Sequence, residues 1–413
     1  MLVGLLALAP LALASSLYTR QGNSYPPAMQ RGPTPRDAWV ATYNAAKAAG
    51  KIPSFAPARI NAAGVPYYTG VKTGEDGVCS WSSAHCFGDD DIFDAPDGMY
   101  AVGFDDGPTP ESVKLYNFLE ANNQTATHFM IGTNVVNNPQ IFQQALDIGG
   151  HIAVHTWSHP YMTSMTDMQV LGELGWTAQA IFDHSNGLIP KFWRPPYGDA
   201  DDRVRAIATE VFGLTLVGWN RDSNDWCLNE GAGASCAQYG LKNQADLEAE
   251  LRGWMVGGKS PGPMGLEHET GAHTVGGFIN TYAGLKQHGW DARCVPDLYN
   301  LPWYQNAVNN DGPIDNSVVI GNGPVSLAVA ASSSTPASSS ASISSNATIL
   351  STATRSTASA SRSAASASTS LTVPTANSQA QAVRDTSGAS GLACASSVGG
   401  AFALVLAGAL VLA

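Results

Sequence analysis

Short apolar runs alternate with amphipathic stretches along the middle of the chain. The apolar runs lie at 100–104, 126–131, 151–155, 191–194, 214–219 and 264–268. The helix-like stretches lie at 111–122, 139–148, 167–183, 200–211, 244–256 and 275–288. In the first of these, Leu115, Phe118, Leu119 and Asn122 recur at three- and four-residue spacing on one face. This alternation predicts an α/β fold of parallel strands and crossover helices, as either a barrel or an open doubly wound sheet.

Both ends of the chain are apolar. Residues 1–14 form a short apolar run ending in Ala12-Leu13-Ala14, which predicts a secretory signal peptide. Residues 387–413 combine small residues, a short spacer and a terminal apolar run, the pattern of a glycosylphosphatidylinositol (GPI) anchor signal. The attachment candidates are Ser387, Gly388 and Ser390. A tail-anchored span is the alternative, although the run is shorter than the roughly 20 residues that a helical span needs.

The segments next to these ends carry no catalytic motif. Residues 330–386 consist mainly of Ser, Thr and Ala, so they cannot bury enough surface to offset their ordering entropy and predict an extended, O-glycosylated stalk. Residues 15–95 are an N-terminal extension, interpreted as either a processed pro-segment or a wrap around the domain. Asn123 and Asn346 begin N-glycosylation sequons.

Cysteine usage and charge exclude some classes of function. Of six cysteines, Cys394 lies in the predicted anchor signal, which leaves an odd number in the globular part. We expect disulfides between Cys227 and Cys236, and between Cys294 and either Cys79 or Cys86. No Cys-x-x-Cys pair is present, which argues against a zinc ribbon or a thioredoxin-like site. The net charge of −12 with scattered basic residues argues against nucleic acid as a partner, and no protein partner is implied.

Ionisable residues recur where the apolar runs end. They are Asp105, Asp106, His155, Arg194, Asp222 and His268. Because active sites of parallel α/β folds form at the carboxyl ends of the strands, we expect these side chains to converge. Two adjacent carboxylates repel each other unless a positive charge lies close by, so the Asp105-Asp106 doublet indicates a cation. Ordinary turn chemistry at Asp-Asp-Gly-Pro is the alternative.

Two histidines supply the other ligands that such a cation needs. His155 and His159 are four residues apart in "HTWSHP", a spacing that predicts both imidazoles on one side of a helical turn. Together with a carboxylate from another strand they would form a zinc site with open positions, with cobalt as a substitute. An unrelated surface pair is the alternative. In "WRPPYGD", Arg194 and Tyr197 belong either to the site or to a structural turn.

Five motifs together resemble a known family. Their order is "FDDGP", "HTWSH", "RPPYG", "DSNDW" and "LEHE". This order is similar to the polysaccharide deacetylases of carbohydrate esterase family 4, with their NodB-like domain, and in particular to fungal chitin deacetylases. The resemblance covers roughly residues 96–290 and implies an irregular (β/α) barrel, which we assign to residues 96–310.

The resemblance also implies a role for each motif residue. Asp105 would be the general base, oriented by Arg194, and His268 the general acid, held by Asp225. The metal ligands would be Asp106, His155 and His159.

The remaining implied roles concern substrate binding. The backbone N–H of Tyr197 would donate to the oxyanion, while Trp226 and Leu266 would line a pocket for the acetyl methyl. Gly103 and Glu269 depart from the family pattern, where Thr or Ser and Asp are usual, without removing a catalytic atom.

The chemistry agrees with this resemblance. An acetamide is a poor electrophile, so its hydrolysis needs a polarised carbonyl, an activated water and a proton for the departing nitrogen. We therefore expect a zinc-dependent chitin deacetylase that yields chitosan and acetate at a fungal cell wall and, through a GPI anchor, at the plasma membrane. The alternatives are a deacetylase of peptidoglycan or xylan, or a surface glycoprotein that binds carbohydrate without turnover.

Overall fold

The computed structural model describes residues 24–74, 77–229, 236 and 239–325. The predicted signal peptide, stalk and anchor signal lie outside these residues, as does Asn346. Among the described helices, none combines the length and the apolar character that crossing a membrane requires.

Five parallel strands form the largest sheet, in the order β4-β5-β6-β7-β8. Their bounds are Gly103–Gly107, Thr127–Met130, His151–Val154, Phe192–Trp193 and Thr215–Leu216. Nearly every residue of these strands is buried, as expected when helices cover parallel strands. The predicted α/β architecture is confirmed, because each strand overlaps a predicted apolar run.

Six further strands form two-stranded sheets. The pairs are β1 (Arg59–Ile60) with β2 (Pro66–Tyr67), β9 (Arg221–Asp222) with β10 (Gly265–Leu266), and β3 (Met99–Ala101) with β11 (Asp291–Arg293). Single bridges join Asp105 to His268 and Ala101 to Met264, which sets β10 beside β4. Within the described residues the ladders make four separate sheets, so ladder pairing alone does not produce the predicted barrel.

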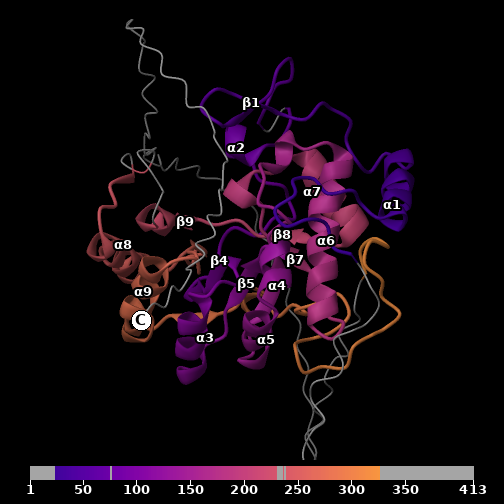
Figure 1. Cartoon of the computed structure of the whole chain (residues 1–413). Coiled ribbons are helices and arrows are strands. Elements are labelled where there is room, and N and C mark those ends of the chain that lie inside the picture. The colour runs from indigo at the N-terminus through magenta and orange to yellow at the C-terminus, as the bar shows by residue number, and fades with distance from the viewer. Residues whose placement is uncertain (1–23, 75–76, 230–235, 237–238, 326–413) are drawn as a thin grey trace, which may run out of the picture. The chain divides into compact units, whose positions relative to one another are not determined.

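Helices surround the strands (Figure 1). The longer ones are α1 (Asp37–Ala48), α3 (Ser112–Ala121), α5 (Pro139–Asp147), α6 (Asp167–His184), α7 (Asp202–Phe212), α8 (Gln244–Val256) and α9 (Ala272–Thr281). The shorter ones are α2 (Trp81–Ala84), α4 (Gly132–Asn137), α10 (Ala283–Gln287) and α11 (Val295–Leu298). Figure 1 shows α8 and α9 on the opposite side of the strands from α6 and α7.

Local sequence explains where several helices begin and end. Thr166 and Gln169 form a capping box at the start of α6, which satisfies backbone N–H groups that otherwise lack partners. Gly213 ends α7 in a left-handed conformation with φ 62°, the usual glycine stop. The predicted helix 275–288 is instead two helices, α9 and α10, separated at Tyr282.

The N-terminal extension packs against α6 and α7 through α1. Trp39 is 2% exposed, and its ring meets Trp176 and Phe212 edge to face at centroid distances of 5.5 and 5.8 Å. No room remains for a side chain at Gly175, where a Cβ would lie 2.5 Å from the Trp39 ring. This part of the extension therefore shares the hydrophobic core.

The disulfides differ from expectation in one pair. Cys227–Cys236 is formed, as predicted. The pairing of Cys294 with Cys79 or Cys86 is wrong, because Cys79 bonds Cys86, with their Cα atoms 5.0 Å apart. Cys294 is buried and forms no disulfide with another described cysteine, and burial raises the pKa of its thiol well above the ordinary value.

Candidate active site

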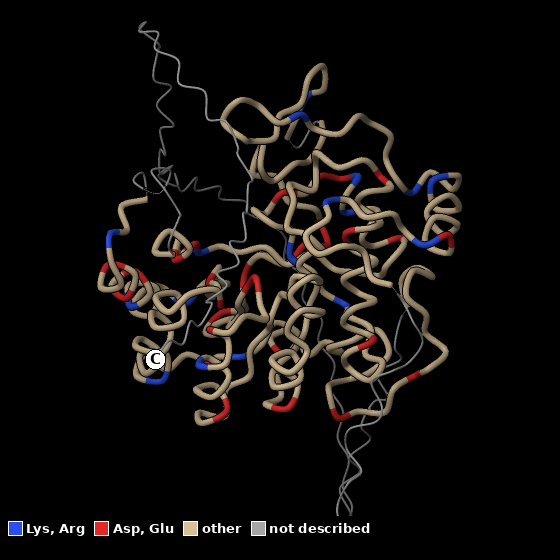
Figure 2. Tube along the Cα trace, viewed as in Figure 1, with Lys and Arg blue, Asp and Glu red and all other residues tan. Residues whose placement is uncertain are grey.

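The two carboxylates of the doublet occupy the carboxyl end of β4. Asp105 pairs in the ladder with Phe129, and the register then shifts before Gly107. Asp106 has a left-handed backbone with φ 72°. Such an irregularity re-aims a side chain that regular alternation would direct to the opposite face. Figure 2 shows acidic residues close to the centre of the trace, in the region of β4, as well as on outer helices.

The two histidines follow β6 in an irregular loop. Their predicted helical turn is wrong: residues 155–160 have no helical assignment, and Thr156 and His159 have positive φ values of 65° and 57°. The loop nevertheless directs both imidazoles to one carboxylate. The Nε2 atoms of His155 and His159 each lie 3.3 Å from Oδ1 of Asp106.

The three side chains fit a divalent cation. Their ligand atoms all lie within 4.8 Å of one another. Two ligands of one tetrahedral zinc, each about 2.1 Å from it, are about 3.4 Å apart, close to the 3.3 Å spacing here. Among the described residues, Oδ1 of Asp106 has no hydrogen-bond partner although it is buried, which is costly unless a cation contacts it. These residues can therefore hold a metal ion.

The protonation states also suit a metal. Nδ1 of His155 lies 2.7 Å from the Arg194 carbonyl oxygen, which can only accept, so the ring carries its proton there and leaves Nε2 free. Burial lowers the pKa of His159 to about 4. Burial would raise the pKa of Asp106, but His159, His155 and His268 hold it below the ordinary value. A neutral imidazole and an ionised carboxylate are the forms that bind metals.

Asp105 is held by a buried ion pair. Its side chain is 2% exposed, and Nη1 of Arg194 donates to Oδ1 at 2.8 Å. The guanidinium also donates to the Val217 and Gly218 carbonyl oxygens, and it lies 4.1 Å from the Phe129 ring centroid. Arg194 therefore fixes the orientation of Asp105. The other carboxylate oxygen lies 3.7 Å from Nε2 of His155.

His268 and Asp225 form a second buried pair beside Asp105. Nδ1 of His268 lies 2.6 Å from Oδ1 of Asp225, and the His268 backbone N–H donates to Oδ2 at 2.8 Å. Burial lowers the pKa of His268, but Asp225, Asp106 and Asp105 outweigh this and raise it to about 10. The imidazole is therefore protonated at neutral pH and carries a proton to donate.

The residues expected to bind substrate lie at different distances from this centre. The Tyr197 ring meets His159 edge to face at 4.7 Å and stacks on Tyr161 at 4.1 Å. Leu266 pairs with Asp222 across β9 and β10, and Trp226 lies in the 3-10 helix Asp225–Leu228, against Tyr239. The described contacts join Tyr197 to the metal ligands but do not join Trp226 or Leu266 to them. Asn123 is exposed, and its glycosylation stays a prediction.

One functional residue was missed by sequence reasoning. Glu173 of α6 is fully buried, and its carboxylate accepts from the backbone N–H groups of Trp157 and Ser158, at 2.8 Å each, and from the Ser158 hydroxyl at 2.6 Å. It also accepts from the Gly32 N–H at 2.7 Å. Glu173 thereby ties the loop that carries both histidines to the N-terminal extension. Its position inside a helix gave no signal of this role.

Replacing Glu173 with glutamine should weaken metal binding. The amide brings an NH₂ group to oxygens that accept four donors, so at least one buried N–H loses its partner and the histidine loop loosens. Residues that orient metal ligands typically contribute about 10–100-fold to metal affinity, and we expect a loss in that range. Zinc affinity, measured by chelator competition, checks this. Glu120→Gln, on the exposed face of α3, is the control, and equal affinities would contradict the assigned role.

Comparison with known proteins finds a family match for the part of the chain that holds the three candidate metal ligands. Residues 94–217 match the family model for polysaccharide deacetylases. This segment of the chain is therefore similar to polysaccharide deacetylases.

Individual relatives extend the likeness beyond these residues. The chain is 41% identical over 275 residues to chitin deacetylase 3 of Cryptococcus neoformans var. neoformans, covering 66% of this chain and 65% of that protein. It is 40% identical over 183 residues to chitin deacetylase of Amylomyces rouxii, covering 43% of each chain. The chain thus spans just under two thirds of the length of the Cryptococcus protein. Superposition on the chitin deacetylase structure from Colletotrichum lindemuthianum gives a TM-score of 0.43 at 20% identity, over 50% of this chain and 90% of that one.

Proposed function

We propose that this protein removes N-acetyl groups from N-acetylglucosamine units of chitin, releasing acetate and leaving chitosan. The unpaired Oδ1 of Asp106, between two imidazoles and beside the Asp105–Arg194 pair, supports this function most directly. The similarity to chitin deacetylases at 41% and 40% identity supports chitin as the substrate.

Asp106, His155 and His159 would hold the metal, which we propose is zinc, with cobalt as a substitute. When bound, such an ion polarises a carbonyl oxygen and makes water more acidic. Asp105 accepts the proton of the attacking water, while Arg194 keeps the carboxylate oriented. The water oxygen bonds to the acetyl carbon, and the C–N bond breaks as His268 gives its proton to the departing nitrogen. Asp225 holds His268 for this transfer.

Substrate-binding roles follow the same geometry. The Tyr197 backbone N–H would donate to the oxyanion from its left-handed position beside Pro196, with φ 59°. Leu266 and Trp226 would line the pocket for the acetyl methyl. Each of these roles remains part of the proposal.

The organisation of the whole chain is also proposed. Residues 96–310 would form the catalytic domain as an irregular barrel, closed where the bridges join β10 to β4 and Ile92 to Val217. Residues 330–386 and 387–413 would form the stalk and the GPI signal. With the signal peptide at 1–14, they support a secreted enzyme held at the outer face of the plasma membrane and in the cell wall.

Acetate release from chitin hexamer tests the function. We expect release by the purified protein, loss of release after chelation and its return with zinc. Acetylated xylan and peptidoglycan are assayed side by side. Release from either of these but not from chitin would overturn the substrate, and no release from any of the three would overturn the hydrolase.

A further inference from the structure

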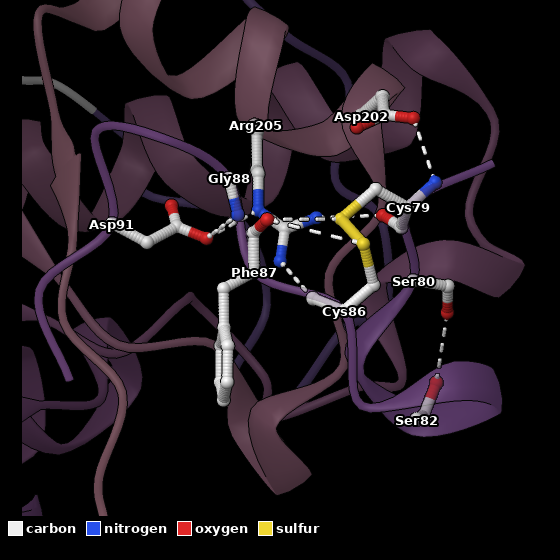
Figure 3. Close-up of a disulfide and its surroundings, with 9 residues drawn as sticks. All are labelled: Cys79, Ser80, Ser82, Cys86, Phe87, Gly88, Asp91, Asp202 and Arg205. Carbon is white, nitrogen blue, oxygen red and sulfur yellow. Dashed lines mark hydrogen bonds and ion pairs between the residues drawn. A yellow bond between two sulfur atoms is a disulfide. The ribbon is translucent and has the colours of Figure 1, made fainter. Parts of the chain in front are cut away.

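A short disulfide loop of the N-terminal extension is held rigidly against α7. Arg205 donates to Asp91 at 2.7 Å and to the carbonyl oxygens of Cys79 and Cys86 at 2.7 and 3.1 Å. Figure 3 shows the guanidinium between Asp91 and the disulfide, with the Phe87 ring directed away from both. Asp202 also accepts from the Cys79 N–H at 2.8 Å. The loop therefore presents Phe87 on a fixed backbone, although this side chain is 45% exposed.

Phe87 belongs to the wall of a cavity of about 350 Å³, called here the aromatic cavity. Its aromatic walls are Trp81, Phe87, Phe93 and Trp219. Ring centroids of Trp81 lie 4.8 Å from Phe87, 5.6 Å from Phe93 and 5.9 Å from Trp219. These rings come from segments far apart in the sequence, and none belongs to the catalytic residues described above.

Polar side chains also line the aromatic cavity. Asp94, Asn220 and Asp222 line it, and the Asn220 amide donates to Asp94 at 2.5 Å. Asp94 and Asp222 are exposed, so their remaining carboxylate oxygens can accept hydrogen bonds from a ligand. Within the described part of the chain, no lysine or arginine lines the cavity, which makes an anionic ligand unfavourable there.

The aromatic cavity borders the active site. Trp81 and Trp219 both pack on Gly198, the residue after Tyr197: a Cβ there would lie 2.2 Å from Nε1 of Trp81 and 3.0 Å from Cη2 of Trp219. The Trp219 ring also lies 5.8 Å from the guanidinium carbon of Arg194, which holds Asp105. On another side of the cavity, Asp222 of β9 lies opposite Leu266 of β10 in the ladder. The cavity is therefore continuous with the segments that carry the catalytic groups.

We propose that the aromatic cavity binds a sugar unit of the chitin chain next to the unit being deacetylated. A pyranose presents an apolar face that packs on aromatic rings, while its hydroxyl groups donate to carboxylates and amides at the ring edge. The cavity volume is within the range of about 300–1,000 Å³ usual for small-molecule sites. The N-terminal extension thus contributes a substrate subsite. This inference rests on the proposed function.

The dependence of acetate release on oligomer length tests this subsite. We expect Phe87→Ala to lower kcat/KM about 10-fold for chitin hexamer, the loss of roughly 1.4 kcal/mol of ring contact. The lower kcat/KM should come from a higher KM with kcat unchanged, because the contact is made equally in the bound substrate and in the transition state. The rate with N-acetylglucosamine, which has no second unit to fill the aromatic cavity, should not change. Phe87→Tyr should restore the hexamer value.

A matched control distinguishes the loss of a substrate contact from a general structural effect of the substitution. Tyr67, in strand β2 of the same extension, is 39% exposed and lies outside the cavity, so Tyr67→Ala should leave both substrates unaffected. Equal losses of Phe87→Ala on N-acetylglucosamine and hexamer would overturn the subsite. If the unsubstituted protein releases no acetate, the affinity for chitin hexamer is measured by calorimetry for the unsubstituted protein and for Phe87→Ala. Weaker binding to Phe87→Ala would still support the subsite while the catalytic proposal fails, and equal binding would overturn it.

Discussion

Replacing Asp106 with asparagine is expected to abolish metal binding and acetate release together. Asn keeps the shape of the side chain and tolerates the left-handed backbone at φ 72°, but it removes the charge that holds the cation. Residues that merely orient ligands contribute about 10–100-fold to metal affinity, so loss of a ligand should exceed the upper value. Zinc affinity by chelator competition and acetate release from chitin hexamer measure the two effects.

The control for this substitution tests whether the variant keeps its folded structure. The thermal transition of Asp106→Asn should stay near that of the metal-free unsubstituted protein, because Oδ1 of Asp106 has no hydrogen-bond partner among the described residues. Glu120→Gln should retain full metal affinity and activity. Full zinc occupancy and normal turnover in Asp106→Asn would show that the three-residue cluster is not the metal site.

Replacing Asp105 with asparagine is expected to leave the metal bound but remove catalysis. The amide cannot accept the proton of the attacking water, and general base catalysis typically contributes about 10²–10⁴-fold. We therefore expect acetate release to fall in that range. Zinc affinity should be nearly unchanged, since Asp106, His155 and His159 remain in place.

This substitution also has a cost in stability. Arg194 is fully buried, and a buried ion pair that loses one partner typically costs about 3–5 kcal/mol. The cost should be smaller here because the Asn oxygen and the Val217 and Gly218 carbonyls still accept from the guanidinium. Acetate release and zinc affinity should therefore be measured well below the thermal transition temperature of the variant. Loss of zinc in parallel with activity would contradict a separate role for Asp105.

Much of the fold was predictable from the hydrophobic pattern. The run at 126–131 contains β5, and the stretch at 244–256 is α8. These elements are local: a buried strand needs a continuous apolar run, and a helix needs apolar residues at three- and four-residue spacing. The interruption of the predicted helix 275–288 at Tyr282 was not predictable, because Tyr282 itself keeps helical backbone angles, with φ −47° and ψ −40°.

The candidate site was predictable where it depends on strand ends. Asp105 and His268 lie about 160 residues apart in the chain, yet their strands are bridged, as the rule for parallel strands predicts. The loop geometry at His155 and His159 was not predictable, because it depends on the positive φ values of Thr156 and His159. The partner of Cys79 likewise depends on the chain path, which brings Cys86 to a Cα distance of 5.0 Å.

By itself, the sequence determined the order of strands and helices, the placement of ionisable residues at strand ends and the set of motifs. All of these are properties of neighbouring residues. Only the tertiary structure decided that Asp106 faces two imidazoles with an unpaired oxygen, that Glu173 holds the histidine loop and that Trp81 packs on Gly198. Each of these joins segments distant in the sequence, where packing and hydrogen bonding rather than local preference choose the partner.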